Sequence, residues 1–349
     1  MEQTYELEST MELIIQDGRV LDAVAHYPEI KLWIDDWLSD KTKFEFETSG
    51  TSGTPKQLIF SREQLVASAL RTCDFFHLQK GTRVLHRLPM RYVAGKMNII
   101  RAMVVGHSVW TEKPSMNFDK AWNTENIHFD WWPTTPAMMS SFMEAKLDVN
   151  IFHAILLGGG KVFPHLINQL TDFKGHCYES YGATETLTHI AIRSITPSLT
   201  PFRFMSGVTV VNNENGIEIM DEVTGVETIL NDAIRFIDED HFEVLGRLDD
   251  VINSGGVKIH PMLVEEVLAS WADLPYYITQ SPDEKWGHAV TLVVVASDLD
   301  FWKNLNLKLI FENHPNWRPK KIIVVQKIDK NENGKVIRKY NPEGLVDSL

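Results

Sequence analysis

The chain has little cysteine, no excess of basic residues and no long apolar run. Two cysteines, Cys73 and Cys177, are too few for a disulfide framework or a thiolate zinc site, which favours a reducing compartment. The 34 Lys and Arg against 47 Asp and Glu give a net charge of −13, which argues against a protein that binds nucleic acids or anionic membranes non-specifically. No apolar run approaches the roughly 18–20 residues that span a bilayer.

Length and composition are those of a globular protein. The 349 residues are 44% hydrophobic and 23% charged, and a chain of this size usually forms two domains or one large domain with a smaller appendage. The start, MEQTYELEST, is acidic and lacks the basic-then-apolar profile of a secretory signal. We therefore expect a cytoplasmic protein.

Short aliphatic runs alternate with helical patterns, which predicts an α/β fold. Residues 42–48 alternate like a strand, and Ser61 with Gln64 three residues later predicts the start of a helix through Cys73. A Ser/Gly/Thr loop lies between this strand and this helix. Further strands are expected at 84–88, 128–132, 154–157 and 216–220. Ligands gather at the carboxyl ends of such strands.

The second half changes character. Residues 231–256 predict a meander of short strands with acidic turns, followed by a helix at 261–271 and strands near 289–295 and 322–326. We place the boundary near Gly246–Asp250, between a large N-terminal α/β domain (1–246) and a small, mobile α+β domain (247–349).

One loop has the composition of a phosphate-binding site. Glycines can turn backbone N–H groups inward, hydroxyls add donors and a lysine adds positive charge. The loop reads Thr48, Ser49, Gly50, Thr51, Ser52, Gly53, Thr54, Pro55, Lys56. It is not a Walker A loop, because Pro55 and Gln57 stand where that pattern needs Gly and Ser or Thr. Composition alone equally allows a flexible surface loop.

This loop resembles the phosphate-binding signature of the adenylate-forming superfamily, which includes acyl-CoA synthetases, luciferases and peptide-synthetase adenylation domains. Four further segments follow in that family's order, at 158–160, 181–186, 246–256 and 329–338, with Asp232 where the family has a ribose-binding Asp. The resemblance implies a large N-terminal adenylate-forming domain, a small mobile C-terminal domain and an AMP-forming acid–thiol ligase that uses ATP, Mg²⁺ and coenzyme A.

The resemblance also implies roles in the nucleotide site. The phosphates would be held by the loop residues Thr48, Ser49, Gly50, Thr51, Ser52, Gly53, Thr54 and Lys56. The nucleotide would be lined by Gly158, Gly159, Gly160, Tyr181 and Gly182, with Asp232 and Arg247 on the ribose. Thr184 would contact phosphate, and Glu185 would hold Mg²⁺. Leu230-Asn231 replace the family's Thr-Gly before that Asp.

Three further roles concern the second half-reaction and the catalytic cation. By resemblance, Asp249 is the hinge of the small domain, and Ser254, Gly255 and Gly256 meet coenzyme A. The resemblance also implies that Lys335 is the catalytic lysine. A mobile ammonium can stabilise the negative charge that gathers as a carboxylate attacks phosphorus. Ile328-Asp329-Lys330 replace the common Leu-Pro-Arg at the entry to this loop.

Three segments narrow the identity of the acid substrate. Residues 88–97, 181–193 and 204–208 resemble small aryl-CoA ligases and above all the o-succinylbenzoate–CoA ligases of menaquinone biosynthesis. Only 47 residues precede the phosphate loop, as in short versions of that family. An acid with two carboxylates needs cationic or multi-donor groups for the one that does not react. The candidates are Arg91, Lys96, Thr186, His189 and Arg193. Many family members have His at the position of Arg91.

Alternatives stay open. The enzyme could activate another aryl or fatty acid, or could load a carrier protein instead of free coenzyme A. From a different class, it could be a nucleotide-binding sensor without catalysis, although Glu185, Asp232, Asp249 and Lys335 together argue against this. Trp131 and Trp132 are a core pair or an aromatic wall of the acid site. The sequence allows a homo-oligomer.

Overall fold

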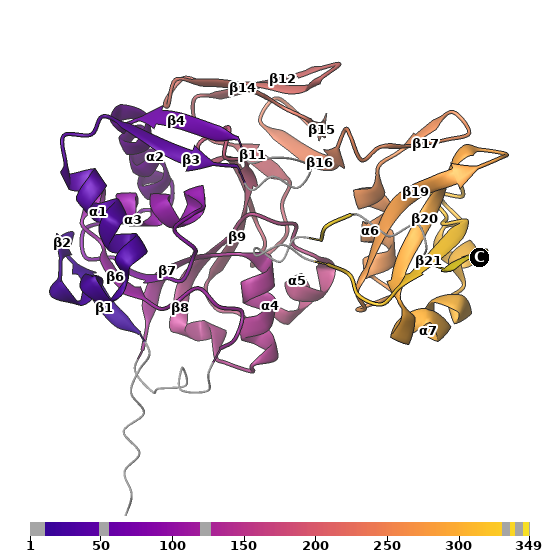
Figure 1. The fold of residues 1–349 in the computed structure, drawn as a ribbon, viewed down its shortest axis with the longest axis horizontal. Helices are drawn as coiled ribbons and strands as arrows, with labels where there is room; N and C mark the ends of the chain where they lie inside the picture. Colours follow the sequence, from indigo (N-terminus) through magenta and orange to yellow (C-terminus); the bar gives the residue numbers. More distant parts are fainter. Residues whose placement is uncertain (1–10, 49–55, 119–126, 330–335, 339–344, 349) are drawn as a thin grey trace, which may run out of the picture. The chain divides into compact units, whose positions relative to one another are not determined.

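A computed structural model describes residues 11–48, 56–118, 127–329, 336–338 and 345–348. The chain divides into two compact units, which are coloured along the sequence in Figure 1. The first unit comprises Met1–Val162, Gln169–Val210 and Ile219–Thr228. The second comprises Phe163–Asn168, Val211–Glu218 and Ile229–Leu349. Among the described residues, no helix is long and apolar enough to cross a membrane.

A mixed sheet forms the centre of the first unit, in the order β11-β10-β9-β8-β7-β5-β6-β1-β2. Its middle strands, from β9 to β6, are parallel. Almost every residue of β7 and β8 is buried, as expected for parallel strands covered on both faces. The strands are β1 (Glu12–Gln16), β2 (Arg19–Val20), β5 (Arg83–His86), β6 (Ser108–Thr111), β7 (Phe129–Thr134), β8 (Phe152–Leu157), β9 (His176–Gly182), β10 (His189–Ser194) and β11 (Phe202–Phe204).

Helices and a separate hairpin complete this unit. The helix α2 packs against α3 and against β4 of the β3–β4 hairpin (Figure 1). The bounds are α1 (Pro28–Leu38), β3 (Lys43–Glu47), β4 (Gln57–Ser61), α2 (Arg62–Phe75), α3 (Val93–Val105), α4 (Pro136–Glu144) and short 3-10 helices at Asp22–His26 and Val149–Ile151. The core includes Trp131 and Trp132, both fully buried, so this pair belongs to the core.

The predicted start of α2 is confirmed. Ser61 Oγ accepts the backbone N–H of Gln64 at 3.3 Å, and the Gln64 side chain accepts the backbone N–H of Ser61 at 2.9 Å. These two bonds satisfy two N–H groups that an uncapped helix end would leave unpaired.

The connection between the phosphate loop and α2 differs from the expectation. The loop does not lead directly into the helix, because Gln57–Ser61 form the strand β4, which pairs antiparallel with β3. Phe60 is buried on this strand, with its ring 5.6 Å from that of Phe46. The loop is therefore the connection of a β-hairpin.

A three-stranded sheet in the order β12-β13-β14 follows β11 along the chain, and a short helix, α5, precedes β9. Their bounds are α5 (Pro164–Gln169), β12 (Val208–Asn213), β13 (Gly216–Asp221) and β14 (Val226–Leu230). The strands expected at 84–88, 128–132, 154–157 and 216–220 are confirmed by β5, β7, β8 and β13.

The second unit contains the expected meander and a small α+β body. Its apolar core includes Ile252, Val264, Leu292, Trp302 and Ile322. The elements are β15 (Asp232–Phe236), β16 (His241–Arg247), β17 (Ile252–Ser254), β18 (Val257–Ile259), α6 (Pro261–Ala269), β19 (Tyr276–Asp283), β20 (Gly287–Val295), a 3-10 helix (Ala296–Asp298), α7 (Leu299–Asn304), α8 (Leu307–Ile310), β21 (Lys321–Val325) and β22 (Leu345–Ser348). The domain boundary near 246–250 stays a prediction.

We expect the substitution Ser61→Ala to lower the free energy of unfolding by about 1 kcal/mol, because it removes the side-chain acceptor for the Gln64 N–H. Urea unfolding followed by far-ultraviolet circular dichroism measures this change. Ser61→Asp, which keeps a capping oxygen, is the matched control and should stay near the wild-type value. Equal stability of Ser61→Ala and wild type would contradict a stabilising role for this cap.

Candidate active site

Two of the predicted motifs meet at the carboxyl ends of neighbouring parallel strands. Strand β8 leads into Gly158–Gly160, and strand β9 ends with Tyr181 and Gly182. Ser180 Oγ donates to the carbonyl of Leu157 at 3.1 Å. A Cβ on Gly158 would lie 2.7 Å from that hydroxyl oxygen, so a larger residue there would displace the Ser180 hydroxyl from this bond. The glycine triplet and Tyr181 therefore lie at one edge of the sheet, where ligands bind in such folds.

The turn that follows Gly182 carries Thr184 and Glu185. Gly182 and His189 pair across this turn, and a Cβ on Gly182 would lie 2.3 Å from the Thr188 carbonyl oxygen. Thr186 Oγ1 accepts the Ala183 N–H at 2.9 Å and lies 2.6 Å from the Thr188 carbonyl oxygen. These bonds fix Thr186 within the turn. The side chains of Thr184 and Glu185 are half-buried, so the turn leaves them available to a ligand.

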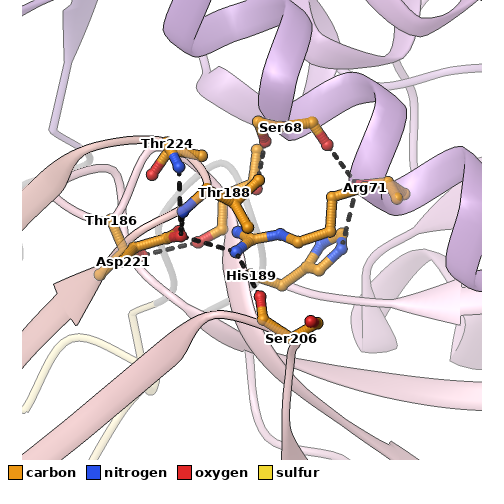
Figure 2. Close-up of polar contacts among 10 residues, drawn as sticks. Ser68, Arg71, Thr186, Thr188, His189, Ser206, Asp221 and Thr224 are labelled. Atoms are coloured by element: carbon orange, nitrogen blue, oxygen red, sulfur yellow. Dashed lines mark hydrogen bonds and ion pairs between the residues drawn. The ribbon is translucent and has the colours of Figure 1, made fainter.

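Helix α2 holds the far side of this turn, as Figure 2 shows. Ser68 Oγ lies 2.8 Å from Thr188 Oγ1, and Thr72 Oγ1 lies 3.2 Å from His189 Nε2. Burial, then the charges of Arg101 and Arg71, hold the pKa of His189 well below its usual value. His189 is therefore a neutral hydrogen-bonding group at physiological pH.

Next to this contact, Arg71 forms a buried ion pair with Asp221 at 2.8 Å (Figure 2). The same Asp221 oxygen accepts the N–H groups of Val223 (3.1 Å) and Thr224 (3.2 Å). The charge of Arg71 is thus matched within the protein.

The phosphate-loop prediction falls partly outside the described residues: Ser49, Gly50, Thr51, Ser52, Gly53 and Thr54 lie there. Its two ends are described. The Thr48 N–H donates to the Lys56 carbonyl at 3.0 Å, and Thr48 Oγ1 accepts the Lys56 N–H at 3.0 Å. Thr48 and Lys56 therefore close the base of the loop, directly beyond the Glu47–Gln57 pair of the hairpin.

In the second unit, the structure brings together two residues that the sequence separates. Asp232 on β15 lies opposite Arg247 on β16, and Asp232 Oδ1 is 3.3 Å from Arg247 Nη1. Arg247 remains exposed. A ribose contact is predicted for both residues, and their cross-strand pairing would allow both to contact the same ribose. Asp249 follows in an exposed turn between β16 and β17, a position that suits a hinge.

Gly255 and Gly256 form the two-residue turn between β17 and β18, each with a positive φ, at 60° and 81°. Ser254 precedes them and is buried. The Trp286 ring lies against the turn, because a Cβ on Gly255 would meet it at 2.6 Å. Lys320 Nζ is 4.0 Å and Lys285 Nζ is 4.8 Å from the centre of that ring. An aromatic surface with two cations therefore adjoins the glycine turn.

Lys335 lies outside the described residues. After it, the Ile337 N–H donates to the Asp329 carbonyl at 2.9 Å, and Arg338 pairs with Glu265 at 2.5 Å and 2.8 Å. The chain on both sides of residues 330–335 is thus anchored to the second unit.

The four charged or imidazole candidates for the acid do not converge. Arg91 is exposed, with its guanidinium 5.0 Å from the centre of the Tyr92 ring. Lys96 donates to the Glu45 carbonyl at 2.9 Å and lies 4.6 Å from the centre of the Trp33 ring. Arg193 pairs with Glu179 at 2.5 Å. Lys96 thus supports β3, and of the four only His189 lies beside the turn that carries Glu185.

A residue that the sequence reasoning missed is Arg101, on α3. It is 4% exposed, and its guanidinium makes no ion pair or hydrogen bond with any described residue. Burial lowers the pKa of Arg101 to about 10, so it still carries its charge at neutral pH. Its electrostatic neighbours are Cys73, His107 and His189.

None of these neighbours supplies a negative charge. Burial raises the pKa of the Cys73 thiol to about 11 and lowers the pKa of His107 to about 4, so both are neutral near pH 7. A buried cation without a counter-ion is costly and suits a site that an anionic ligand completes. In the sequence, the apolar residues around Arg101 give it the pattern of an ordinary helix position.

Known proteins resemble this chain in sequence and in fold. The sequence profile of the family described as "AMP-binding enzyme" matches residues 46–231, more than half of the chain. The chain is 25% identical to the 2-succinylbenzoate–CoA ligase of Listeria monocytogenes over 346 residues, which cover 90% of this chain and 73% of that ligase.

Solved structures have the same fold. A crystal structure of an acyl-CoA synthetase (AMP-forming)/AMP-acid ligase II-like protein from Dyadobacter fermentans is 28% identical, with a TM-score of 0.59 over 89% of this chain and 92% of that chain. The o-succinylbenzoate CoA synthetase from Bacillus subtilis, in complex with its acyl-adenylate intermediate, is 21% identical, with a TM-score of 0.70 over 86% and 69%.

We expect the substitution Thr186→Val to weaken the binding of Mg·ATP by about tenfold, because it removes the bonds that shape the turn presenting Thr184 and Glu185. Isothermal titration calorimetry measures this affinity. Thr186→Ser retains the hydroxyl and should bind nearly as well as wild type. If the valine variant is folded and binds with wild-type affinity, these bonds do not organise the nucleotide site.

Proposed function

The chain belongs to the family of AMP-binding enzymes, and from this premise we propose that it is an o-succinylbenzoate–CoA ligase. As an AMP-forming acyl-CoA ligase it works in two steps, the formation of an acyl adenylate and the transfer of the acyl group to coenzyme A. The observation that carries the choice of acid is the buried guanidinium of Arg101, whose charge no described residue compensates.

In the first step, a carboxylate oxygen of the acid attacks the α-phosphorus of ATP, the acyl–phosphate bond forms and pyrophosphate leaves. The Gly158–Gly160 segment and Tyr181 border the nucleotide, and Thr48 and Lys56 close the base of the loop that takes the phosphates. Lys335 supplies a cation to the charge that develops on the α-phosphoryl oxygens.

Glu185 is the residue that would hold Mg²⁺. Its side chain is half-buried and directly follows the half-buried Thr184 in the chain, and carboxylate and hydroxyl oxygens suit Mg²⁺. No group of three or more His, Cys, Asp or Glu side chains among the described residues could hold a metal ion, so phosphate oxygens of ATP would complete the coordination. When bound, the ion neutralises phosphate charge.

In the second step, the thiol sulfur of coenzyme A attacks the acyl carbonyl, the thiol proton passes to solvent and AMP leaves. Rotation about Asp249 would exchange Lys335 for the Ser254–Gly256 turn between the two steps. Trp286, with Lys285 and Lys320 near its ring, offers a stacking surface and positive charge for the nucleotide end of coenzyme A. A carrier protein has no such nucleotide, so this patch favours coenzyme A as the acceptor.

The carboxylate of o-succinylbenzoate that does not react would pair with Arg101. Its electrostatic neighbour His189 begins the strand that follows the Glu185 turn, so an anion beside Arg101 would lie near the reacting end of the site. His189 is neutral and Asp221 matches the charge of Arg71, so Arg101 is the unmatched positive charge of these described residues, and o-succinylbenzoate brings one negative charge beyond its reacting carboxylate. A fatty acid would leave Arg101 unpaired.

The test is an assay with ATP, Mg²⁺, coenzyme A and o-succinylbenzoate that follows pyrophosphate and thioester together. We expect both products in equal amounts. Pyrophosphate without thioester would move the acceptor to a carrier protein, and activity with only other aryl or fatty acids would overturn the proposed acid. Absence of products with every acid, in a protein that binds ATP, would favour the nucleotide sensor.

We expect Arg101→Met to remove the preference for an acid with two carboxylates. Wild type should use o-succinylbenzoate with a kcat/KM about 100-fold above that for 4-oxo-4-phenylbutanoate or 2-butanoylbenzoate, each of which lacks one carboxylate. In Arg101→Met, the ratio for the analogue that still reacts should fall to about one.

Arg83→Met is the matched control, since Arg83 lies at the opposite, N-terminal end of β5, with its guanidinium 5.2 Å from the centre of the Trp110 ring. It should keep the wild-type preference. A folded Arg101→Met variant that also keeps this preference would show that another group holds the second carboxylate.

A further inference from the structure

Glu179 is a buried carboxylate whose two oxygens have different partners. It lies on β9 and is 4% exposed. Oε1 accepts the backbone N–H of Val162 at 3.2 Å, while Oε2 lies 2.7 Å from Nε and 2.5 Å from Nη2 of Arg193 on β10. One side chain thus joins the segment after β8 to a strand two places away in the sheet order β10-β9-β8.

The two ends of this connection reach the two predicted walls of the nucleotide site. Val162 lies in the segment between β8 and α5, which begins with Gly158–Gly160. At the other end, the Arg193 guanidinium lies 4.6 Å from the centre of the Phe202 ring, and that ring lies 5.9 Å from the ring of Tyr181. The pair is therefore continuous with both the glycine triplet and Tyr181.

We propose that Arg193 and Glu179 are positioning residues for ATP, which hold the glycine triplet and Tyr181 at the separation that the nucleotide needs. This assigns Arg193 to the nucleotide site in place of the acid site that its sequence position suggested. The inference rests on the proposed function for ATP binding and is independent of which acid is used.

The electrostatics of the pair make the proposal testable by pH. Burial raises the pKa of the Glu179 carboxyl, and the charge of Arg193 is the largest effect that opposes the rise. The hydrogen bonds from Arg193 and the Val162 N–H and the charge of Lys161 also lower this pKa. Cys177 is a further titratable neighbour, and burial raises the pKa of its thiol, which is therefore neutral. Removal of the Arg193 charge therefore raises this pKa further.

The direction of the expected pH effect follows from the protonation state of Glu179. With its pKa raised in the folded state, Glu179 is tolerated in neutral form at low pH and becomes a buried, unpaired anion as the pH rises through that pKa. In Arg193→Met, the nucleotide site should thus worsen with rising pH relative to wild type.

The experiment measures KM for ATP and KM for the acid by pyrophosphate release, for wild type and Arg193→Met, from about pH 5.5 to about pH 8.5. We expect KM for ATP to rise about tenfold near pH 7.5 while KM for the acid changes less than about twofold. The ratio of the variant's KM for ATP to that of wild type should grow with pH. Arg193→Lys should recover part of the loss.

The double variant Glu179→Gln/Arg193→Met removes the titrating group, so its ratio should be independent of pH. It also serves if Arg193→Met alone does not fold, because it leaves no unpaired charge, and its KM for ATP should still exceed that of wild type. Arg235→Met, which breaks an exposed pair with Glu243 in the second unit, is the matched control and should leave both KM values unchanged.

A selective rise in KM for the acid would overturn the proposal and return Arg193 to the acid site. Unchanged KM values in folded Arg193→Met and in the double variant would also overturn it. Calorimetry with ATP in the absence of acid separates this failure from failure of the proposed function. Wild type that binds no ATP would refute the proposed function, whereas equal binding by wild type and Arg193→Met would refute this inference alone.

Discussion

Parallel pairing of β7, β8 and β9 is the constraint on which the candidate site depends. It brings Thr134, Leu157 and Gly182 to the same edge of the sheet, so segments far apart in the sequence end side by side. The Gly158 N–H donates to the Thr134 carbonyl at 3.0 Å, and Ser180 reaches the Leu157 carbonyl, so this edge is bound by polar contacts beyond the ladder itself. Because a Cβ on Gly158 would displace the Ser180 hydroxyl, the glycine permits this polar contact between the strand ends.

Elements with strong local signals were predictable from the sequence. The apolar runs of β7 and β8 and the reciprocal Ser61–Gln64 bonds of α2 depend on neighbouring residues, and the structure confirms them. Strand β4 was missed because Gln57–Ser61 is short and becomes a strand only through its pairing with β3. In the same way, a ribose contact could be predicted for Asp232 and for Arg247 separately, but only the β15–β16 register makes them partners.

Charged residues were harder to place, because a sequence shows a charge without its partner. Lys96 and Arg193 had the residue type that a carboxylate needs, yet the first donates to a backbone carbonyl and the second to Glu179. For Arg101 the indication came from the structure and not from the sequence. It stands among apolar residues of α3, and only its burial without a described partner makes it a candidate for an anion. The useful signal was thus the balance of charge in three dimensions.

The presence or absence of a buried carboxylate partner among the described residues divides the three arginines Arg71, Arg101 and Arg193 of the first unit into two groups. A buried ion pair contributes little net stability against apolar residues of similar shape, but the loss of one partner is costly, so such pairs fix the geometry of the groups they join. The Arg71–Asp221 pair joins α2 to the 221–224 turn, and the Arg193–Glu179 pair joins β10 to the segment after β8. Arg101 has no such task, since no described side chain balances it. With no counter-ion among the described residues, an anionic ligand bound beside Arg101 would balance its charge, and this would link the binding free energy of that ligand to the relief of a buried cation.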